Sequence, residues 1–275
     1  MDAGVDPLAL LMLQLEWGAD DALDAEPVSR LRPVADTTPN LSRRGEPPTG
    51  SPGAGAIMVP VTAPAKPSGR RTPAERAEAA AALADNLEAL RAAITAFDGC
   101  PLRDTASHAV LAEGSPSSGL LLIGEPPCAD EDRAGRVFAG REGALLDRML
   151  ASIGISRGSL LLTPLIPWRP PGGRPPNPGE LTVCLPFLHR LITLAAPHRL
   201  VISGGLAART LLGAQAARRR ANPGWADCRI PGLAEPVPAL TLPGLAMLLK
   251  TPGLRRDAWA GLRLLRRTID NETNQ

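Results

Sequence analysis

The sequence has 275 residues, and 44% of them are hydrophobic, which is enough for a substantial core and excludes a wholly disordered chain. The formal net charge of +2 hides an uneven distribution: residues 1–75 carry ten acidic and seven basic residues, so the remainder has a net charge of +5. Such an excess suits a surface that contacts phosphate. Twenty-eight of the thirty basic residues are Arg, which favours bidentate phosphate contacts, although a biased genome composition would produce the same skew.

Cysteine spacing and hydropathy narrow the class of protein further. The cysteines share no C-x-x-C spacing, which argues against a zinc ribbon and a thioredoxin-like site; they are Cys100, Cys128, Cys184 and Cys228. The apolar run at residues 8–15 follows acidic rather than basic residues and is too short for a membrane span. We therefore expect a cytoplasmic protein whose thiols stay reduced.

Composition divides the chain into two parts. Residues 1–71 are expected to form a low-complexity, largely disordered extension, because residues 20–71 are rich in Pro, Gly, Ser and Asp. A short amphipathic helix near residues 6–17 is the one element expected in this extension. Residues 72–275 are expected to form the folded domain.

The domain should open with a helix and continue with alternating strands and helices. Thr72, Pro73 and Glu75 have capping-box spacing, and an Ala- and Leu-rich run follows to about residue 96. Short apolar runs predict strands at residues 120–123, 159–162, 199–202 and 237–242. Helical spacing predicts helices at residues 142–153, 178–195, 206–212, 245–249 and 254–268.

This alternation determines the expected fold class, a three-layer α/β/α domain with a central, mainly parallel four-stranded sheet. In such sheets ligands bind beyond the carboxyl ends of the strands. That rule directs attention to the segments after the expected strands, residues 124–140, 163–174 and 242–250.

Several motifs occur in the order typical of one enzyme family. Residues 123–143 are similar to its first motif, G-E-A-P-G followed by F-V-G-R-x-G, and L-L-D-R-M-L follows in register at residues 145–150. Later motifs follow at residues 168–174 (W-R-P-P-G-G-R), 184–188 (C-L-P-F-L) and 248–259. Across roughly residues 97–265 the chain therefore resembles the family-4 uracil-DNA glycosylases, which implies their fold and a role in DNA repair.

The resemblance implies a pocket for a uracil base that has left the base stack. By resemblance, Phe138 stacks on the flipped base, and Glu125 orients water or polarises the site. The turn around Glu125 would present backbone amides to the uracil carbonyls, and the residues implied in binding are Gly124, Pro126, Pro127, Cys128, Phe138 and Thr163. From the residues alone, two alternatives stay open: Phe138 as a core side chain, and Glu125 as the cap of the next turn.

Two of the family's polar groups are missing from this sequence. The family's His corresponds to Leu242, before Pro243, and its base-reading Asn corresponds to Pro164, beside Thr163. Leu has no donor, and Pro lacks even its amide hydrogen. Loss of one such donor slows an enzyme by about a hundred- to a thousand-fold, so we expect a slow enzyme, a relaxed base specificity or no catalysis. The histidines of the chain lie outside the motif positions, at His108, His189 and His198.

The family's four-iron four-sulfur cluster is held by four cysteines, and this sequence keeps two of them. By resemblance, Cys100 and Cys184 occupy ligand positions, whereas Phe97 and Trp168 occupy the other two. Four-iron clusters normally need four thiolates. We therefore expect no metal and no cofactor, with the two aromatic rings filling the volume of the cluster.

DNA is the expected partner, in single- or double-stranded form, and the protein is expected to be a monomer. The residues expected to contact DNA are Arg169, Arg174, Leu242, Pro243 and Lys250. The basic ones would bind phosphate, although ordinary solvated loop charges would look the same in the sequence. The apolar segment at residues 242–247 would enter the gap left by the flipped base.

Three functions are compatible with these observations to different degrees. The first is a DNA glycosylase that hydrolyses the N-glycosidic bond of uracil, or of a related deaminated base, in base-excision repair. The second is a catalytically impaired relative that binds DNA or damaged bases without turnover, which the two missing polar groups suggest. A generic nucleotide-binding α/β protein has little support, because neither G-x-G-x-x-G nor a P-loop is present.

Overall fold

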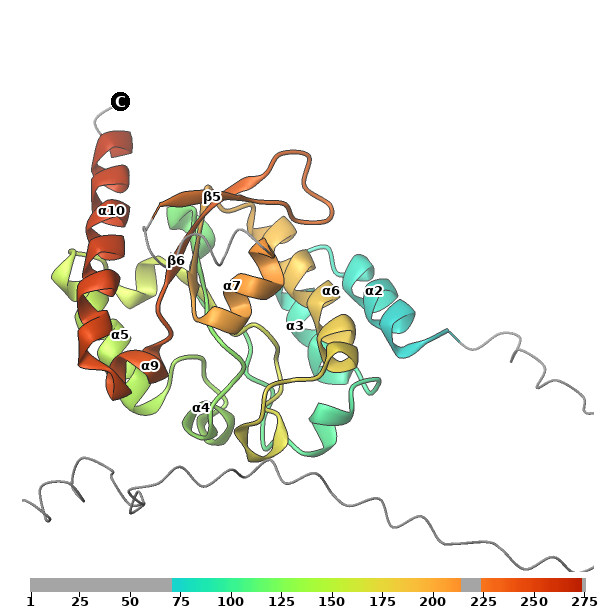
Figure 1. Cartoon of the computed structure of the whole chain (residues 1–275). Helices are drawn as coiled ribbons and strands as arrows, with labels where there is room; N and C mark the ends of the chain where they lie inside the picture. The colour runs from blue at the N-terminus through green and yellow to red at the C-terminus, as the bar shows by residue number, and fades with distance from the viewer. Residues whose placement is uncertain (1–70, 214–223, 274–275) are drawn as a thin grey trace, which may run out of the picture. The chain divides into compact units, whose positions relative to one another are not determined.

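The computed structural model of the chain describes residues 71–213 and 224–273, which belong to one compact unit (Figure 1). The expected extension lies outside the described residues, apart from Arg71, and so does its short helix near residues 6–17. The division of the chain at residue 72 stays a prediction. In the described ranges, no helix is both long enough and apolar enough to cross a membrane.

A six-stranded sheet in the order β1-β3-β2-β4-β6-β5 forms the centre of this unit. The strands are β1 (Glu113–Gly114), β2 (Leu120–Ile123), β3 (Leu161–Thr163), β4 (Arg199–Ser203), β5 (Trp225–Cys228) and β6 (Val237–Leu242). Four neighbouring strands run parallel, as predicted, whereas β1 and β5 are antiparallel edge strands. The prediction of four strands was therefore incomplete, because β1 is the polar pair Glu113–Gly114 and β5 contains the exposed Asp227, so neither strand is a continuous apolar run.

Helices cover both faces of the sheet (Figure 1). They are α2 (Pro73–Leu83), α3 (Leu87–Ala96), α4 (Ala129–Ala134), α5 (Gly140–Ser152), α6 (Pro178–Ala195), α7 (Gly205–Leu212), α9 (Leu245–Lys250) and α10 (Arg255–Thr273). Short 3-10 turns lie at η1 (Pro101–Asp104), η2 (Pro116–Ser118), η3 (Arg157–Ser159), η4 (Pro171–Gly173) and η5 (Pro252–Leu254). Because α2, α3, α6 and α7 lie on one side and α5, α9 and α10 on the other, the three-layer α/β/α prediction is confirmed.

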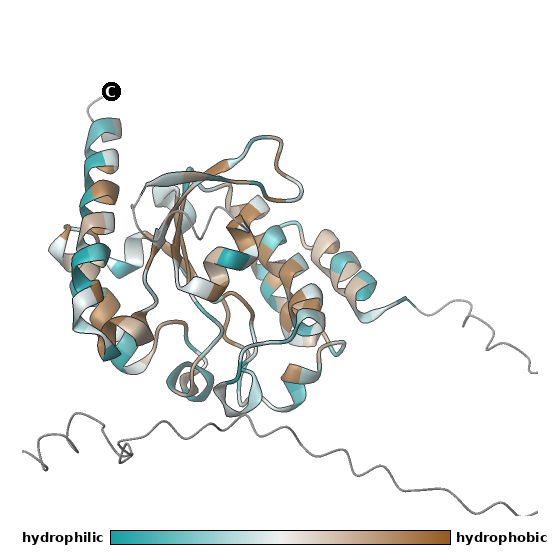
Figure 2. Ribbon diagram, in the orientation of Figure 1, coloured by the Kyte–Doolittle hydropathy of each residue, from teal (hydrophilic) through white to brown (hydrophobic). Residues whose placement is uncertain are grey.

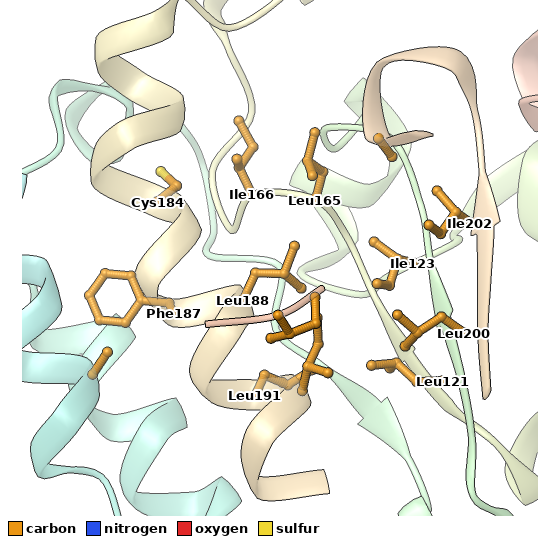
Figure 3. Close-up of a cluster of buried hydrophobic side chains, with 14 of the residues drawn as sticks. Leu121, Ile123, Leu165, Ile166, Cys184, Phe187, Leu188, Leu191, Leu200 and Ile202 are labelled. Atoms are coloured by element: carbon orange, nitrogen blue, oxygen red, sulfur yellow. The ribbon is translucent and has the colours of Figure 1, made fainter. Parts of the chain in front are cut away.

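Alternate side chains of the central strands enter two separate cores. On β2, Leu121 and Ile123 face the side of α6, whereas Leu122 faces the side of α5 and α10. Figure 3 shows the first of these cores, in which the two β2 side chains approach Leu188 and Leu191 of α6. The strands are apolar and the outer surfaces of the helices are largely polar (Figure 2). Burial on both faces explains why β2 and the centre of β4 are continuous apolar runs.

The first helix begins as predicted but ends earlier. Thr72 Oγ1 accepts the Glu75 N–H at 3.3 Å, and Glu75 Oε2 accepts the Thr72 N–H at 2.7 Å, so the capping box is confirmed. The prediction of one uninterrupted helix is wrong, because α2 ends at Leu83. Asn86 Oδ1 accepts the Ala89 N–H at 2.8 Å and thereby caps the start of α3. Asn favours such a cap because its side chain competes with the helix for backbone hydrogen bonds.

Candidate functional site

A cavity of about 560 Å³ lies beyond the carboxyl ends of β2, β4 and β6, where a parallel sheet is expected to bind its ligand. Its volume falls within the roughly 300–1,000 Å³ typical of small-molecule sites. The turn after β2, the loop before α5, the η4 region and the first turns of α7 and α9 all line it. Another cavity, of about 320 Å³, lies at the opposite ends of β2 and β4 beside His198 and contains none of the predicted site residues.

Phe138 lines the larger cavity, and its ring lies against the backbone of Gly124. A Cβ atom at Gly124 would be 2.8 Å from Phe138 Cζ, so only glycine leaves room for the ring. Phe138 is 5% exposed and adopts a left-handed backbone conformation (φ 50°), which is costly for a residue with a side chain. The ring therefore belongs both to the core on the α5 side and to the cavity wall.

Buried hydrogen bonds hold Phe138 in this conformation. The Glu131 carboxylate, which is 6% exposed, accepts the Phe138 N–H at 2.6 Å and the Cys128 N–H at 2.7 Å. Arg157 donates to the Phe138 carbonyl oxygen at 3.0 Å, and a Cβ atom at Gly143 would lie 1.8 Å from that same oxygen. Burial raises the pKa of Glu131, and its two N–H donors oppose the rise. The acidic part of the first motif thus supports the site from behind.

Glu125, the predicted catalytic residue, lies on the cavity wall at the N-terminus of α7. Its Oε1 accepts the Leu206 N–H at 2.8 Å, and a helix N-terminus favours a negative charge. Gly204 (φ 120°) makes room for the carboxylate, since a Cβ atom there would be 2.0 Å from Oε1. Oε2 has no hydrogen bond to any described residue. Glu125 therefore caps a helix 81 residues further along the chain, and only one of its two oxygens is used for this cap in the described structure.

The turn after β2 offers fewer amide donors than the sequence predicted. The Gly124 N–H bonds to the carbonyl of the neighbouring strand at 2.8 Å, the Cys128 N–H is bonded to a carboxylate, and Pro126 and Pro127 have no N–H. In the described structure, only the Glu125 N–H of this turn has no acceptor. The prediction of several amides facing uracil is therefore wrong, because the turn uses them to hold itself together. Burial raises the pKa of the Cys128 thiol to about 11, so this side chain lines the cavity in its neutral form.

Five predicted site residues do not line the cavity: Gly124, Thr163, Leu242, Pro243 and Lys250. Thr163 is buried, and its hydroxyl donates to the next carbonyl oxygen at 3.2 Å. Leu242 ends β6 and packs against α10, where a Cβ atom at Gly261 would lie 2.4 Å from its Cδ2. Pro243 follows, and its carbonyl oxygen accepts the Ser203 hydroxyl at 3.4 Å. The side chains of Thr163 and Leu242 serve internal packing and do not reach the cavity.

The predicted basic residues occupy three different environments. Arg169 lines the cavity; its nearest carboxylate oxygen, Asp132 Oδ2, is 3.9 Å away, and its buried Nε has no hydrogen-bond partner among the described residues. Arg174 also lines the cavity but makes two hydrogen bonds of 2.6 and 2.9 Å to Glu180, which lower the pKa of that carboxyl. Lys250 is exposed at the end of α9, outside the cavity. Arg169 is therefore the predicted cation best placed to meet a ligand.

Two charged residues that line the cavity were not predicted from the sequence. Arg209 of α7 enters the site only through the packing of α7 beside β4, so no motif marks it. Glu142 lies in the first turn of α5, four residues after Phe138, and is half-buried in the cavity wall. Burial raises the pKa of Glu142, and the charge of Glu131 adds to the rise. Its position inside the G-R-E-G segment of the first motif could have identified Glu142 as a site residue. However, an acid in the first turn of a helix is also common because it stabilises the helix.

The four positions related to the iron–sulfur ligands come together in the core. Cys100 Sγ and Cys184 Sγ are 3.7 Å apart, and the stacked rings of Phe97 and Trp168 have centroids 6.5 Å apart. The Phe97 ring also meets Phe187 edge-on at 5.2 Å. Two thiols and two packed rings do not fit a four-iron cluster, which needs four thiolates. In the part of the chain that the structure describes, no three His, Cys, Asp or Glu residues are grouped to hold a metal.

Sequence comparison places this fold and site in a known superfamily. A sequence model of the uracil DNA glycosylase superfamily matches residues 111–263, which is more than half of the chain and includes every strand and every segment around the cavity. The chain therefore belongs to the uracil DNA glycosylase superfamily.

Individual relatives point to one branch of that superfamily. The chain is 38% identical over 127 residues to the type-4 uracil-DNA glycosylase of Pyrobaculum aerophilum, covering 46% of this chain and 65% of that protein. Type-4 uracil-DNA glycosylases of Sulfurisphaera tokodaii (35% over 121 residues; 44% and 55%) and Thermotoga maritima (35% over 108 residues; 39% and 56%) are also similar. The matches thus span 55–65% of the relatives' lengths. The family-4 resemblance predicted from the motifs is confirmed.

Proposed function

We propose that this protein is a DNA glycosylase that hydrolyses the N-glycosidic bond of uracil, or of a related deaminated base, as a step of base-excision repair. The observation that carries this proposal is the cavity that both Phe138 and Glu125 line. A glycosylase needs such a pocket because its target atom is inaccessible in the base stack. Membership of the superfamily and similarity to proteins named type-4 uracil-DNA glycosylase support the same activity.

Phe138 would hold the extruded base. Stacking of one base on an aromatic ring contributes about 1–3 kcal/mol, which offsets part of the unstacking cost of a few kcal/mol. Glu131 and Arg157 fix the backbone on both sides of the ring before any ligand arrives. The platform is therefore preorganised and needs no ordering on binding.

Glu125 would act on the sugar. Cleavage proceeds through an oxocarbenium-like sugar and a departing base anion, so a carboxylate near the sugar stabilises positive charge or orients the attacking water. The Leu206 N–H fixes one oxygen of Glu125, which leaves the other for this task. Arg209 lines the same cavity and would supply positive charge for the base anion. We expect slow turnover, because neutral donors aimed at the base are scarce in the described site.

DNA would approach over the mouth of the cavity. Met247, at the start of α9, is 53% exposed and lines the cavity, so it suits the role of an apolar wedge beside the flipped nucleotide. Arg169 would contact phosphate there, with Lys250 further along α9. A monomeric state, a cytoplasmic location and activity on single- or double-stranded DNA belong to this proposal as well.

We infer further that the protein works without an iron–sulfur cluster. Phe97 and Trp168 fill the space beside the two remaining thiols, and their packing supports replacement of the cluster by an apolar core. No step of the proposed reaction depends on a metal.

One alternative has specific support. By resemblance, Leu242 occupies the position of the family's His, and Thr163 adjoins the position of its base-reading Asn. Both side chains serve internal packing here. The protein would then bind uracil-containing or damaged DNA without releasing a base. This reading predicts binding without turnover, so the two functions can be separated directly.

The test uses a uracil-containing oligonucleotide, purified full-length protein and alkali, which cleaves the strand wherever a base has been lost. Glu125→Gln retains an oxygen for the Leu206 N–H but loses the negative charge. This variant and Phe138→Ala, tested separately, should each abolish strand breaks. Glu78→Gln, on the exposed face of α2, is the matched control and should behave like the wild type. Binding without breaks in the wild type would favour the alternative, and neither binding nor breaks would contradict both.

A further inference from the structure

Glu142 differs from the other acids around the cavity in having no partner. Its carboxyl is half-buried in the cavity wall and forms no hydrogen bond or ion pair with any described residue. The buried acids behind the site are fully used: Glu131 accepts two backbone N–H groups, and Asp132 accepts the N–H groups of the segment around residues 107 and 108. Glu125 is held by α7. Because Glu142 lines the cavity and is not used by another group of the described protein, its carboxyl is available to a ligand in the cavity.

The surroundings of Glu142 favour its neutral form. Burial is the main cause of its raised pKa, and Glu131 and Asp130 of α4 and Glu125 of the β2 turn add repulsion. Lys250 of α9 acts in the opposite direction. A protonated carboxyl presents one O–H donor beside one carbonyl acceptor, which is the same pattern that a side-chain amide presents.

The cavity otherwise lacks a group with this pattern. No Asn or Gln lines it within the described chain, and the hydroxyl of Thr163 is turned to a backbone carbonyl. Uracil carries an N–H donor at N3 flanked by two carbonyl acceptors. A ring held against Phe138 would therefore present a donor and an acceptor, side by side, to the cavity wall.

We propose that Glu142 reads the N3–H and an adjacent carbonyl of the base held against Phe138. The carbonyl oxygen of the Glu142 carboxyl accepts the N3–H, and its O–H donates to the carbonyl of the base. This inference rests on the proposed function and names the residue that recognises the substrate of the same site. Ionisation of Glu142 removes the donor and places a negative charge against the base carbonyl, so recognition weakens as pH rises.

The experiment measures base recognition separately from bond cleavage. Fluorescence anisotropy follows the binding of oligonucleotides that carry one 2′-fluoro-2′-deoxyuridine, which resists hydrolysis, or its N3-methyl derivative, which lacks the N3–H. The wild type should prefer the unmethylated base by about tenfold at pH 5, the effect of losing one or two hydrogen bonds, and by less at pH 8, where the N3–H of the probe is still protonated. Glu142→Ala should lose this preference. Glu142→Gln should keep it at both pH values, because an amide does not titrate.

A preference that is absent from the wild type, or that is unchanged in Glu142→Ala, would overturn the inference. Glu78→Gln is again the control for a distant charge, and thermal melting shows that each variant is folded. The proposed function can fail separately from this inference. If the wild type prefers the unmethylated base but never releases uracil from an ordinary deoxyuridine strand, the protein is not a glycosylase, and Glu142 still recognises the base.

Discussion

The Phe138 N–H lies 2.6 Å from Glu131 Oε1, and the other carboxylate oxygen accepts the Cys128 N–H at 2.7 Å. One buried side chain therefore links the end of the β2 turn to the residue expected to stack on the base. The chain between these two residues includes α4, so the carboxylate fixes both ends of that segment. The acid contributes to the site through geometry without lining the cavity.

Replacement of Glu131 by Gln should destabilise this arrangement. The amide has a single carbonyl oxygen, so one of the two N–H groups would face an NH2 group and remain buried without an acceptor. We expect the free energy of unfolding to fall by about 1–3 kcal/mol, measured by urea denaturation. Glu113→Gln is the control, because Glu113 pairs only with the exposed Arg136, at 3.4 Å, and such a pair contributes about 0–1 kcal/mol. Equal effects of the two substitutions would contradict the supporting role of Glu131.

Gly143→Ala should displace Phe138 without changing any polar group. Its Cβ atom would lie 1.8 Å from the Phe138 carbonyl oxygen, so either α5 or the loop must move. We expect a loss of about tenfold or more in uracil excision or in binding to uracil-containing DNA, because small misplacements at a site are costly. The matched control is Gly158→Ala, where the nearest atom would be 3.9 Å away. Wild-type behaviour of Gly143→Ala would show that the ring position is unimportant.

The parts of this protein that the sequence predicts well depend on local patterns. Strand β2 is an apolar run buried on both faces, the other three parallel strands are mainly apolar, and the Thr72–Glu75 capping box is a contact between residues three apart. The motif order also predicts correctly that Glu125 and Phe138 line the same cavity. The strands and the capping box follow from spacing, whereas the shared cavity of Glu125 and Phe138 follows from the family resemblance.

The parts that the sequence does not predict depend on contacts between distant segments. Leu206 lies 81 residues from the carboxylate of Glu125 that it binds, so nothing near Glu125 indicates that it caps α7. The Cys128 amide appears available in the sequence but is consumed by Glu131. Glu142 shows the opposite case, because a first-turn acid that usually stabilises a helix is placed in the wall of the cavity instead.

Phe97 should carry much of the stability of the core beside the two thiols. Its ring is 6% exposed, stacks on Trp168 and meets Phe187 edge-on. Phe97→Ala removes this packing and should lower the free energy of unfolding by about 3–5 kcal/mol in guanidinium denaturation. Leu83→Ala, at a side chain that is 86% exposed, is the control and should change stability by less than about 0.5 kcal/mol. A small effect at Phe97, or a brown wild-type protein with stoichiometric iron, would contradict an apolar core at these positions.

Glu142 should make the protein less stable at high pH than it would be with a neutral residue. The folded-state pKa of Glu142 is raised, chiefly by burial, above its unfolded value of about 4.3. Its contribution to stability is therefore fully present below the unfolded pKa and is lost as pH rises through the folded pKa. Glu142→Gln does not titrate, so its melting temperature should match that of the wild type near pH 4 and exceed it at pH 8. Glu78→Gln, whose carboxyl is exposed, should follow the wild type at both pH values. Equal melting temperatures for Glu142→Gln and the wild type across this range would show that the carboxyl is well solvated and would contradict this prediction. A Glu142→Gln variant that is more stable but binds uracil-containing DNA poorly at high pH would contradict the base-reading role.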